Sequence, residues 1–237
     1  MIPLRDINPR QSFPFITVGL IVINVLVFLF QLSLGPRAGQ QLVFLYGMIP
    51  ARLQVALGGG DVPITAAALP LLTSIFLHGG FLHVLGNMWF LWVFGDNVED
   101  RMGHFRFLTF YLLTGIGAGL IHTFFNWDSA IPAVGASGAI SGVMGAYIAL
   151  FPHSRVVTLV PLLIFFFVAR IPAIVMIGYW FLLQFLSGVA SIGVSATTGR
   201  DVGGVAWWAH IGGFLLGLLL VRMFRRPRRP SPAFVVE

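Results

Sequence analysis

Ser137 lies in the segment Gly135-Ala-Ser-Gly138, between two nearby glycines. Glycines beside a serine let another backbone approach closely and leave the serine N–H accessible. A nucleophile whose own amide helps to hold an oxyanion needs both properties. The segment has a simpler interpretation too, because Gly138 and Gly142 form a small-residue face of the kind that packs membrane helices together. This motif alone leaves both interpretations open.

Two further features could complete the chemistry of a serine nucleophile. His210 lies in an apolar run, where a histidine is costly to bury and marks a functional site by default. His83 and Asn87 are four residues apart, so they share one face of a helix and can both donate hydrogen bonds. The alternatives are a histidine satisfied by one hydrogen bond and a pair of polar contacts between helices. Together, however, a nucleophile, a base and extra donors meet the needs of acyl transfer.

The elements that must position these residues are membrane helices. Of the 237 residues, 57% are hydrophobic and only 9% are charged, whereas soluble domains carry roughly 25% charged residues. A water-soluble globule of this size could not cover so much apolar surface. The composition therefore excludes a soluble domain, a disordered chain and a nucleic-acid-binding protein. The absence of cysteine excludes disulfides, a thiolate nucleophile and a cysteine zinc site.

Six apolar runs predict six membrane spans of about 20 residues each. They cover residues 17–35, 81–94, 107–125, 134–151, 172–189 and 205–223. Residues 156–168 are apolar too, but Pro161 interrupts them and they are short, so we expect an interfacial or re-entrant segment. None of the six runs contains Asp or Glu, which argues against ion-coupled transporters and aspartyl intramembrane proteases. The sequence also lacks the HExxH pattern of metalloproteases.

The arginines predict the orientation in the membrane. With six spans and both termini in the cytoplasm, 11 arginines lie on the inner side and 3 on the outer side, as the positive-inside rule requires. The chain then divides into a short cytoplasmic N-terminus at 1–16, a membrane domain at 17–223 and a basic cytoplasmic tail at 224–237. Ser137, His210 and the pair His83 and Asn87 fall at similar depth below the outer surface, which favours their acting together.

With these motifs in place, the chain resembles the rhomboid family of intramembrane serine proteases, in its bacterial six-span form. The motifs are HGGFLHVLGN at 78–87, GASG at 135–138 and AHIGGFLLG at 209–217. The resemblance implies an all-α, six-helix rhomboid-like bundle with a Ser137–His210 dyad. It also implies an oxyanion hole made by His83, Asn87 and the Ser137 amide.

The resemblance implies several supporting roles as well. His78 corresponds to a structural histidine, and Gly95, Glu99 and Gly103 form a structural loop motif. Gly213 and Gly217 would let the sixth span pack tightly against the fourth, and residues 191–204 with the fifth span would form a cap and lateral gate. Some relatives carry an aromatic residue that stacks on the histidine at the position of Ser141. Its absence leaves open what orients His210.

We therefore expect an intramembrane serine endopeptidase that cleaves transmembrane segments of single-span or polytopic membrane proteins. We expect it in a bacterial inner or cell membrane, in contact with the lipid bilayer, with no metal or organic cofactor and no nucleic-acid partner. One alternative is a rhomboid-like protein that binds membrane helices without cutting them. Another is a metal-binding membrane protein, whose ligands would be His78, His83, His122 and His210.

Overall fold

The structure, a computed structural model, describes residues 1–162, 165–198 and 206–226. Its helices are α1 (Phe15–Ser33), α2 (Gly35–Tyr46), α3 (Pro50–Leu57), α4 (Ile64–Thr73), the short 3₁₀ helix η1 (Ser74–Phe76), α5 (Phe81–Met102), α6 (His104–Phe125), α7 (Ser137–Leu150), α8 (Ala173–Thr198) and α9 (Trp207–Phe224). Its strands are β1 (Ile2–Asp6), β2 (Arg155–Leu162) and β3 (Phe165–Pro172). Residues 227–237 of the predicted tail and residues 199–204 of the predicted cap segment lie outside the described residues.

Each of the six predicted spans corresponds to one of the helices α1, α5, α6, α7, α8 and α9. Four of them, α1, α6, α8 and α9, are long and apolar enough to cross a membrane alone. Helices α4 and α5 pass the same test only as a pair, bent by 76°. Helix α7 has only 14 residues. The predicted helical membrane bundle is confirmed, whereas the count of six spans stays a prediction.

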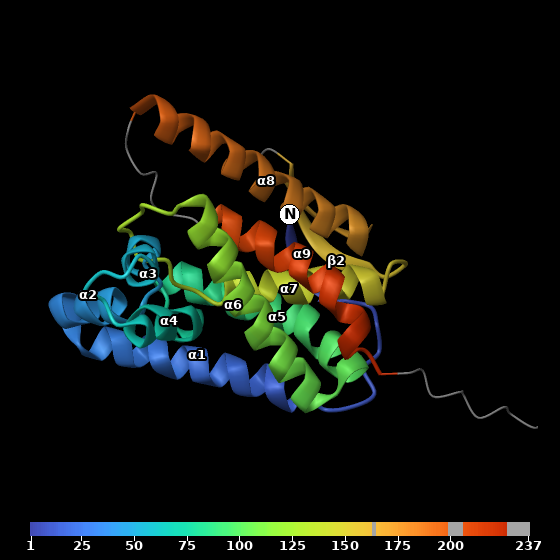
Figure 1. The fold of residues 1–237 in the computed structure, drawn as a ribbon. Coiled ribbons are helices and arrows are strands. Elements are labelled where there is room, and N and C mark those ends of the chain that lie inside the picture. Colours follow the sequence, from blue (N-terminus) through green and yellow to red (C-terminus); the bar gives the residue numbers. More distant parts are fainter. Residues whose placement is uncertain (163–164, 199–205, 227–237) are drawn as a thin grey trace, which may run out of the picture.

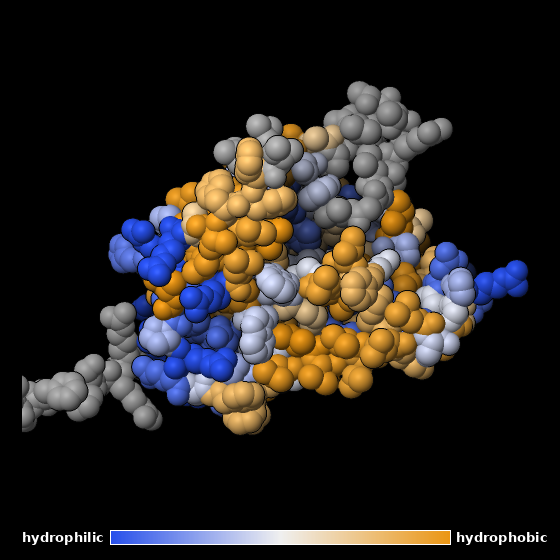
Figure 2. Space-filling view, turned by 180° about the vertical axis from the view of Figure 1, so that it is seen from behind, coloured by the Kyte–Doolittle hydropathy of each residue, from blue (hydrophilic) through white to orange (hydrophobic). Residues whose placement is uncertain are grey.

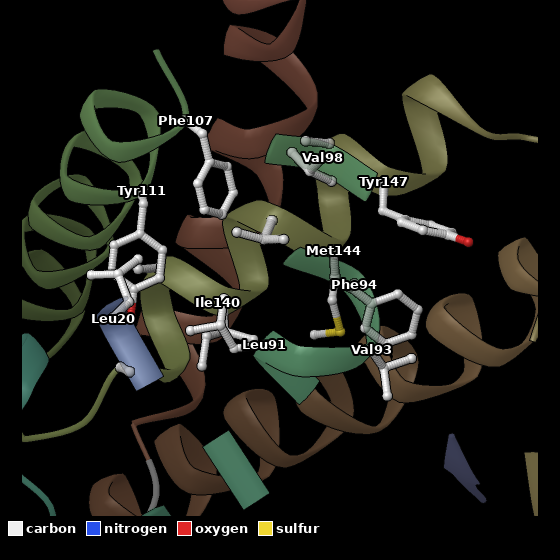
Figure 3. Close-up of a cluster of buried hydrophobic side chains, with 14 of the residues drawn as sticks. Leu20, Leu91, Val93, Phe94, Val98, Phe107, Tyr111, Ile140, Met144 and Tyr147 are labelled. Atoms are coloured by element: carbon white, nitrogen blue, oxygen red, sulfur yellow. The ribbon is translucent and has the colours of Figure 1, made fainter. Parts of the chain in front are cut away.

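Helix α7 occupies the centre of the bundle, with α5, α6 and α9 around it (Figure 1). Ten consecutive residues of α7, from Gly138 to Tyr147, are buried. Figure 3 shows Met144 and Tyr147 of α7 packed among side chains of α5 such as Phe94, whose ring centroid lies 5.0 Å from that of Tyr147. The helix that begins with Ser137 is therefore held on nearly all sides.

Glycines bring α7 and α9 into direct backbone contact. A Cβ atom at Gly213 would overlap the carbonyl oxygen of Gly138, and one at Gly217 would overlap that of Gly142. Tight packing of the sixth predicted span against the fourth is therefore confirmed. Since larger side chains would separate these backbones, the small-residue faces fix the distance between α7 and α9.

Glu99 caps the first turn of α1 from the end of α5. Its fully buried carboxylate accepts hydrogen bonds from the backbone N–H of Ile16 at 2.9 Å and of Thr17 at 2.8 Å, and from the Thr17 hydroxyl at 2.7 Å. A negative charge there satisfies unpaired donors and complements the helix dipole. Gly103, with φ of 81°, follows as the residue that ends α5. These contacts fit the structural role expected for Glu99 and Gly103.

The N-terminal segment and the end of α9 lie at the same end of the bundle. Arg10 pairs with Asp96 of α5 at 3.7 Å, and the Ser12 hydroxyl donates to Asp100. The Arg226 backbone N–H donates to the carbonyl oxygen of Arg101 at 2.9 Å. Both segments thus contact the C-terminal part of α5, as they would if both termini shared one side of the membrane.

Residues 156–162 and 165–168 form strands that the sequence analysis did not predict. They belong to the antiparallel hairpin β2–β3, and β1 pairs with β2 to complete a three-stranded sheet in the order β1-β2-β3. Val156 and Thr158 are buried at alternate positions of β2, as expected for a strand covered on one face. β-Branched and aromatic residues dominate this stretch, a composition typical of strands. The bundle therefore carries a small sheet in addition to its helices.

The surface of the molecule is broadly apolar, as lipid contact requires. Figure 2 shows large hydrophobic areas, with hydrophilic residues gathered mainly toward the two sides of the view. Leu26 of α1, Leu182 of α8 and Leu219 of α9 are among the exposed large hydrophobic side chains. In water such contiguous areas would cause association, so they fit helices that face acyl chains.

Candidate active site

Ser137 and His210 lie within hydrogen-bond distance of each other. Ser137 is the first residue of α7, and His210 lies in the first turn of α9. The distance from Ser137 Oγ to His210 Nε2 is 2.8 Å. His210 is only 9% exposed. Two residues 73 positions apart thus meet because the glycine contacts between α7 and α9 bring their backbones together.

Because Ser137 is the first residue of α7, its backbone N–H is available for a hydrogen bond outside the helix. The first N–H groups of a helix have no partner within the helix, and they carry the positive end of its dipole. The Ile140 N–H donates to the Ala136 carbonyl oxygen at 3.0 Å, in the first turn of α7. The Ser137 N–H is therefore suited to stabilise a developing negative charge.

Gln184 of α8 is a site residue that the sequence analysis missed. Its Oε1 lies 2.6 Å from Nδ1 of His210, on the opposite side of the ring from Ser137. The rings of Trp180 and Trp207 also lie beside the imidazole, with centroids 5.8 Å and 6.3 Å away. An amide side chain in an otherwise apolar span is a signal that could have indicated Gln184, but not its partner.

Gly135 brings the serine loop against His83 and Asn87. Gly135 has φ of 128°, and a Cβ atom there would lie 2.7 Å from His83 Nε2 and 3.4 Å from Asn87 Nδ2. Only glycine combines that backbone conformation with such a close approach. The structure thus brings the predicted donors to the loop that leads into Ser137.

Hydrogen bonds orient both of these donors. The Gly79 N–H donates to Nδ1 of His83 at 3.4 Å, which leaves the proton of a neutral imidazole on Nε2, the atom facing Gly135. Asn87 Nδ2 lies 2.9 Å from His78 Nε2. The Asn87 amide carries two hydrogens, so one can bind His78 while the other remains for a ligand. His78 therefore supports Asn87, in line with its expected structural role.

Ser141 is the alternative nucleophile and His122 the alternative base, and each makes hydrogen bonds elsewhere. Ser141 is fully buried, and its hydroxyl donates to the Ser137 carbonyl oxygen one turn earlier at 2.6 Å. His122, in α6, has its Nδ1 3.4 Å from the side-chain amide of Asn126. Among the described residues, His210 Nε2 is the hydrogen-bond partner of Ser137 Oγ.

A small cavity of about 30 Å³ adjoins Ser137. Ser74, Ser137 and Ala209 contribute to its wall. A volume of this size accommodates about one water molecule. A much larger cavity of about 1160 Å³ lies between α1 and α2, and it reaches His78 but not the dyad.

Comparison with known proteins agrees with this geometry. A Rhomboid domain matches residues 66–227, which include all four predicted site residues. The chain belongs to the rhomboid family. Similar rhomboids include the mitochondrial Rhomboid protein 1 of Saccharomyces cerevisiae, 30% identical over 64% of this chain and 40% of that protein.

Two other relatives widen the comparison. The chloroplastic Rhomboid-like protein 11 of Arabidopsis thaliana is 32% identical over 63% of this chain and 50% of that protein. Rhomboid protease GluP of Bacillus subtilis is 45% identical over 34% of this chain and 16% of that protein. This rhomboid thus spans half or less of the length of these relatives. It is an integral membrane protein, but relatives named mitochondrial and chloroplastic do not support a bacterial inner membrane as its location.

The structure gives the metal-binding alternative no support. Among the described residues of this rhomboid, no group of three or more His, Cys, Asp or Glu side chains is arranged to hold a metal ion. His83 instead lies against Gly135, and His210 contacts the Ser137 hydroxyl.

Proposed function

We propose that this chain is an intramembrane serine endopeptidase that cuts transmembrane segments of other membrane proteins. The observation that carries the proposal is the 2.8 Å contact between Ser137 Oγ and His210 Nε2 within an apolar helical bundle. Membership of the rhomboid family, and the likeness to a relative named as a rhomboid protease, support intramembrane proteolysis in general.

The proposed reaction begins with proton transfer. His210 Nε2 accepts the Ser137 hydroxyl proton as Oγ attacks the carbonyl carbon of the scissile peptide bond. Negative charge develops on the carbonyl oxygen, which His83 Nε2–H, Asn87 Nδ2–H and the Ser137 N–H stabilise. The tetrahedral intermediate collapses, and His210 returns the proton to the leaving amine.

The second half of the reaction hydrolyses the acyl-enzyme. His210 accepts a proton from a water molecule, whose oxygen attacks the ester carbon bound to Ser137 Oγ. The bond from that carbon to Oγ then breaks, Oγ takes the proton back from His210, and the product leaves with a free carboxyl group. The small cavity beside Ser137 supports this step because it has room for one water molecule. No metal or organic cofactor takes part.

The partners follow from the same proposal. Substrates are single-span or polytopic membrane proteins that reach the site through the lipid bilayer, and both termini of the enzyme lie in the cytoplasm. The alternative, a rhomboid that binds membrane helices without cutting them, would need neither dyad residue. The short contact between Ser137 and His210 favours the enzyme.

Cleavage assays in detergent and in liposomes test the proposal. The purified protein is incubated with a panel of single-span substrates, beside Ser137→Ala and the matched control Ser141→Ala. We expect cleavage by the wild type and by Ser141→Ala only. We also expect a fluorophosphonate probe to label Ser137, as identified by peptide mass spectrometry. Substrate capture without cleavage, or labelling at Ser141, would overturn the proposal.

A further inference from the structure

We propose that Gln184 is a positioning residue that holds the His210 imidazole in the tautomer that a general base requires. This inference rests on the proposed protease function. It starts from two contacts on one ring, Nδ1 to Gln184 Oε1 at 2.6 Å and Nε2 to Ser137 Oγ at 2.8 Å. The imidazole is thus held between an amide oxygen and the nucleophile.

The chemistry of the amide oxygen decides the tautomer. A neutral imidazole carries one proton, on Nδ1 or on Nε2, and the nitrogen without the proton is the acceptor. An amide oxygen can only accept, so a short contact with Gln184 Oε1 places the proton on Nδ1. Nε2 then presents its lone pair to Ser137, which is the arrangement that lets the base remove the hydroxyl proton.

Among the described residues, Gln184 lies in an apolar contact. It is only 8% exposed, on a face of α8 where Ile177 is fully buried and Phe181 packs on Phe214 with ring centroids 4.6 Å apart. A polar side chain in such an apolar contact is costly unless it is hydrogen-bonded, and more so in a membrane. The partner that offsets this cost is His210.

Helix α8 is shaped to bring Gln184 to that position. Gly188, one turn after Gln184, faces α9, and a Cβ atom there would lie 3.3 Å from Ile211 and 3.4 Å from Trp207. Trp180, one turn before Gln184, lies beside the His210 ring. The face formed by Trp180, Gln184 and Gly188 therefore seats α8 on the first turns of α9.

One consequence concerns how the site is assembled. Ser137 and His210 come from α7 and α9, whereas the orienting group comes from α8, which lies at the edge of the bundle (Figure 1). A base oriented in this way is competent only while α8 rests on α9. Displacement of α8 would free the imidazole to turn without unfolding the rest of the site.

The test compares two substitutions of Gln184 with a packing control. Gln184→Leu removes the acceptor at similar size, and Gln184→Glu keeps an acceptor oxygen. Phe181→Leu disturbs the same face of α8 without touching His210. We expect Gln184→Leu to lower kcat on the order of 10- to 100-fold, by analogy with the loss of groups that fix the tautomer of metal-bound histidines, with little change in KM. Gln184→Glu should restore most of kcat, and an ionised carboxylate there should move the acid limb of its pH–rate profile to higher pH.

Nitrogen NMR of histidine-labelled protein reads the tautomer directly. The signals that disappear in His210→Ala identify the ring. We expect Nδ1–H for His210 in the wild type and in Phe181→Leu, and a shift toward Nε2–H in Gln184→Leu. Thermal unfolding in detergent shows which variants are folded.

Two results would overturn the role of Gln184. One is an unchanged tautomer and kcat in folded Gln184→Leu, and the other is an equal loss of kcat in Phe181→Leu. If the wild type cleaved no substrate and bound no fluorophosphonate, the proposed function would fail instead, and the tautomer measurement would still decide the role of Gln184.

Discussion

Asn87 is the single residue whose loss best separates transition-state stabilisation from substrate binding. Its amide faces the loop before Ser137 and is held by His78. Removal of one oxyanion donor typically costs about 10²–10³ in rate, and the loss should be graded because three donors share the charge. We expect Asn87→Ala to reduce kcat strongly and to leave KM nearly unchanged. Initial rates against substrate concentration measure both constants.

The Asn87 measurement has an informative opposite outcome. If Asn87→Ala raised KM and left kcat intact, the residue would serve binding or packing. Because Asn87 also contacts His78, each preparation must first show a wild-type melting temperature. If the melting temperature of Asn87→Ala were much lower than that of the wild type, the loss of rate would reflect a loss of structure.

His210 and His122 form a natural pair for testing the base. His210 lies 2.8 Å from the serine hydroxyl, whereas His122 has Nδ1 near Asn126. We therefore expect no detectable cleavage by His210→Ala and near wild-type cleavage by His122→Ala, measured with the same substrate and enzyme concentration. Appreciable activity in His210→Ala would make His122 the base to examine.

At the scale of helices, the contact between α7 and α9 has no space for a methyl group. A Cβ atom at Gly217 would overlap the Gly142 carbonyl oxygen, while one at Gly178 of α8 would meet no atom within 4 Å. Overpacking of this kind costs about 1–3 kcal/mol. We expect Gly217→Ala to lower the melting temperature and the activity, and the matched control Gly178→Ala to preserve both. Equal melting temperatures for the two variants would contradict the proposed tight contact.

The attachment of strand β1 to the bundle predicts a dependence on pH. Asp6 accepts hydrogen bonds from the Tyr147 hydroxyl at 2.7 Å and from the Asn97 amide at 2.8 Å. Burial raises the pKa of Asp6 from 3.8 to about 6, and the nearby Asp96 adds to the rise, although the Tyr147 hydrogen bond opposes it. The folded protein thus binds more protons than the unfolded chain between about pH 4 and pH 6. Its stability should fall as the pH rises through this window.

Asp6→Asn tests this dependence because asparagine keeps an acceptor oxygen but does not titrate. We expect the variant to be as stable as the wild type near pH 4 and more stable at pH 7, in thermal unfolding followed at several pH values. Other carboxylates titrate in both proteins, so the informative quantity is the difference in melting temperature. A difference that does not change with pH would show that Asp6 does not control this attachment.

At the scale of the whole molecule, the arginines and the packing predict one orientation in the membrane. Arg10 and Arg226 both contact the end of α5, and 11 of the 14 arginines fall on the side that we assign to the cytoplasm. We therefore expect a reporter that works only in the cytoplasm to be active when it is fused after Glu237, and a reporter that works only outside the cytoplasm to be inactive there. Activity of an exoplasmic reporter at that position would overturn the six-span topology and the shared depth of the site residues.

Several features could be predicted from the sequence because they depend on composition or on short-range periodicity. Apolar runs predict membrane helices wherever they are long enough to cross a bilayer. The spacing of His83 and Asn87 places them on one helix face. The glycines at 135 and 138 identify Ser137 as a residue with an accessible backbone. These properties need no knowledge of which helices are neighbours.

Other features depend on contacts between distant segments, so only the tertiary structure decided them. Gln184 lies 26 residues from His210, and its role appears only when α8 rests on α9. Strands β2 and β3 gained a third strand from β1, whose residues lie 150 to 157 positions before their partners in β2. Periodicity alone does not distinguish a helix from a strand in an apolar run of that length, and the pairing with β1 shows that it is a strand. Its interfacial or re-entrant location stays a prediction. The local sequence pattern therefore indicated which residues could take part in the site, and long-range packing determined which of them are in contact.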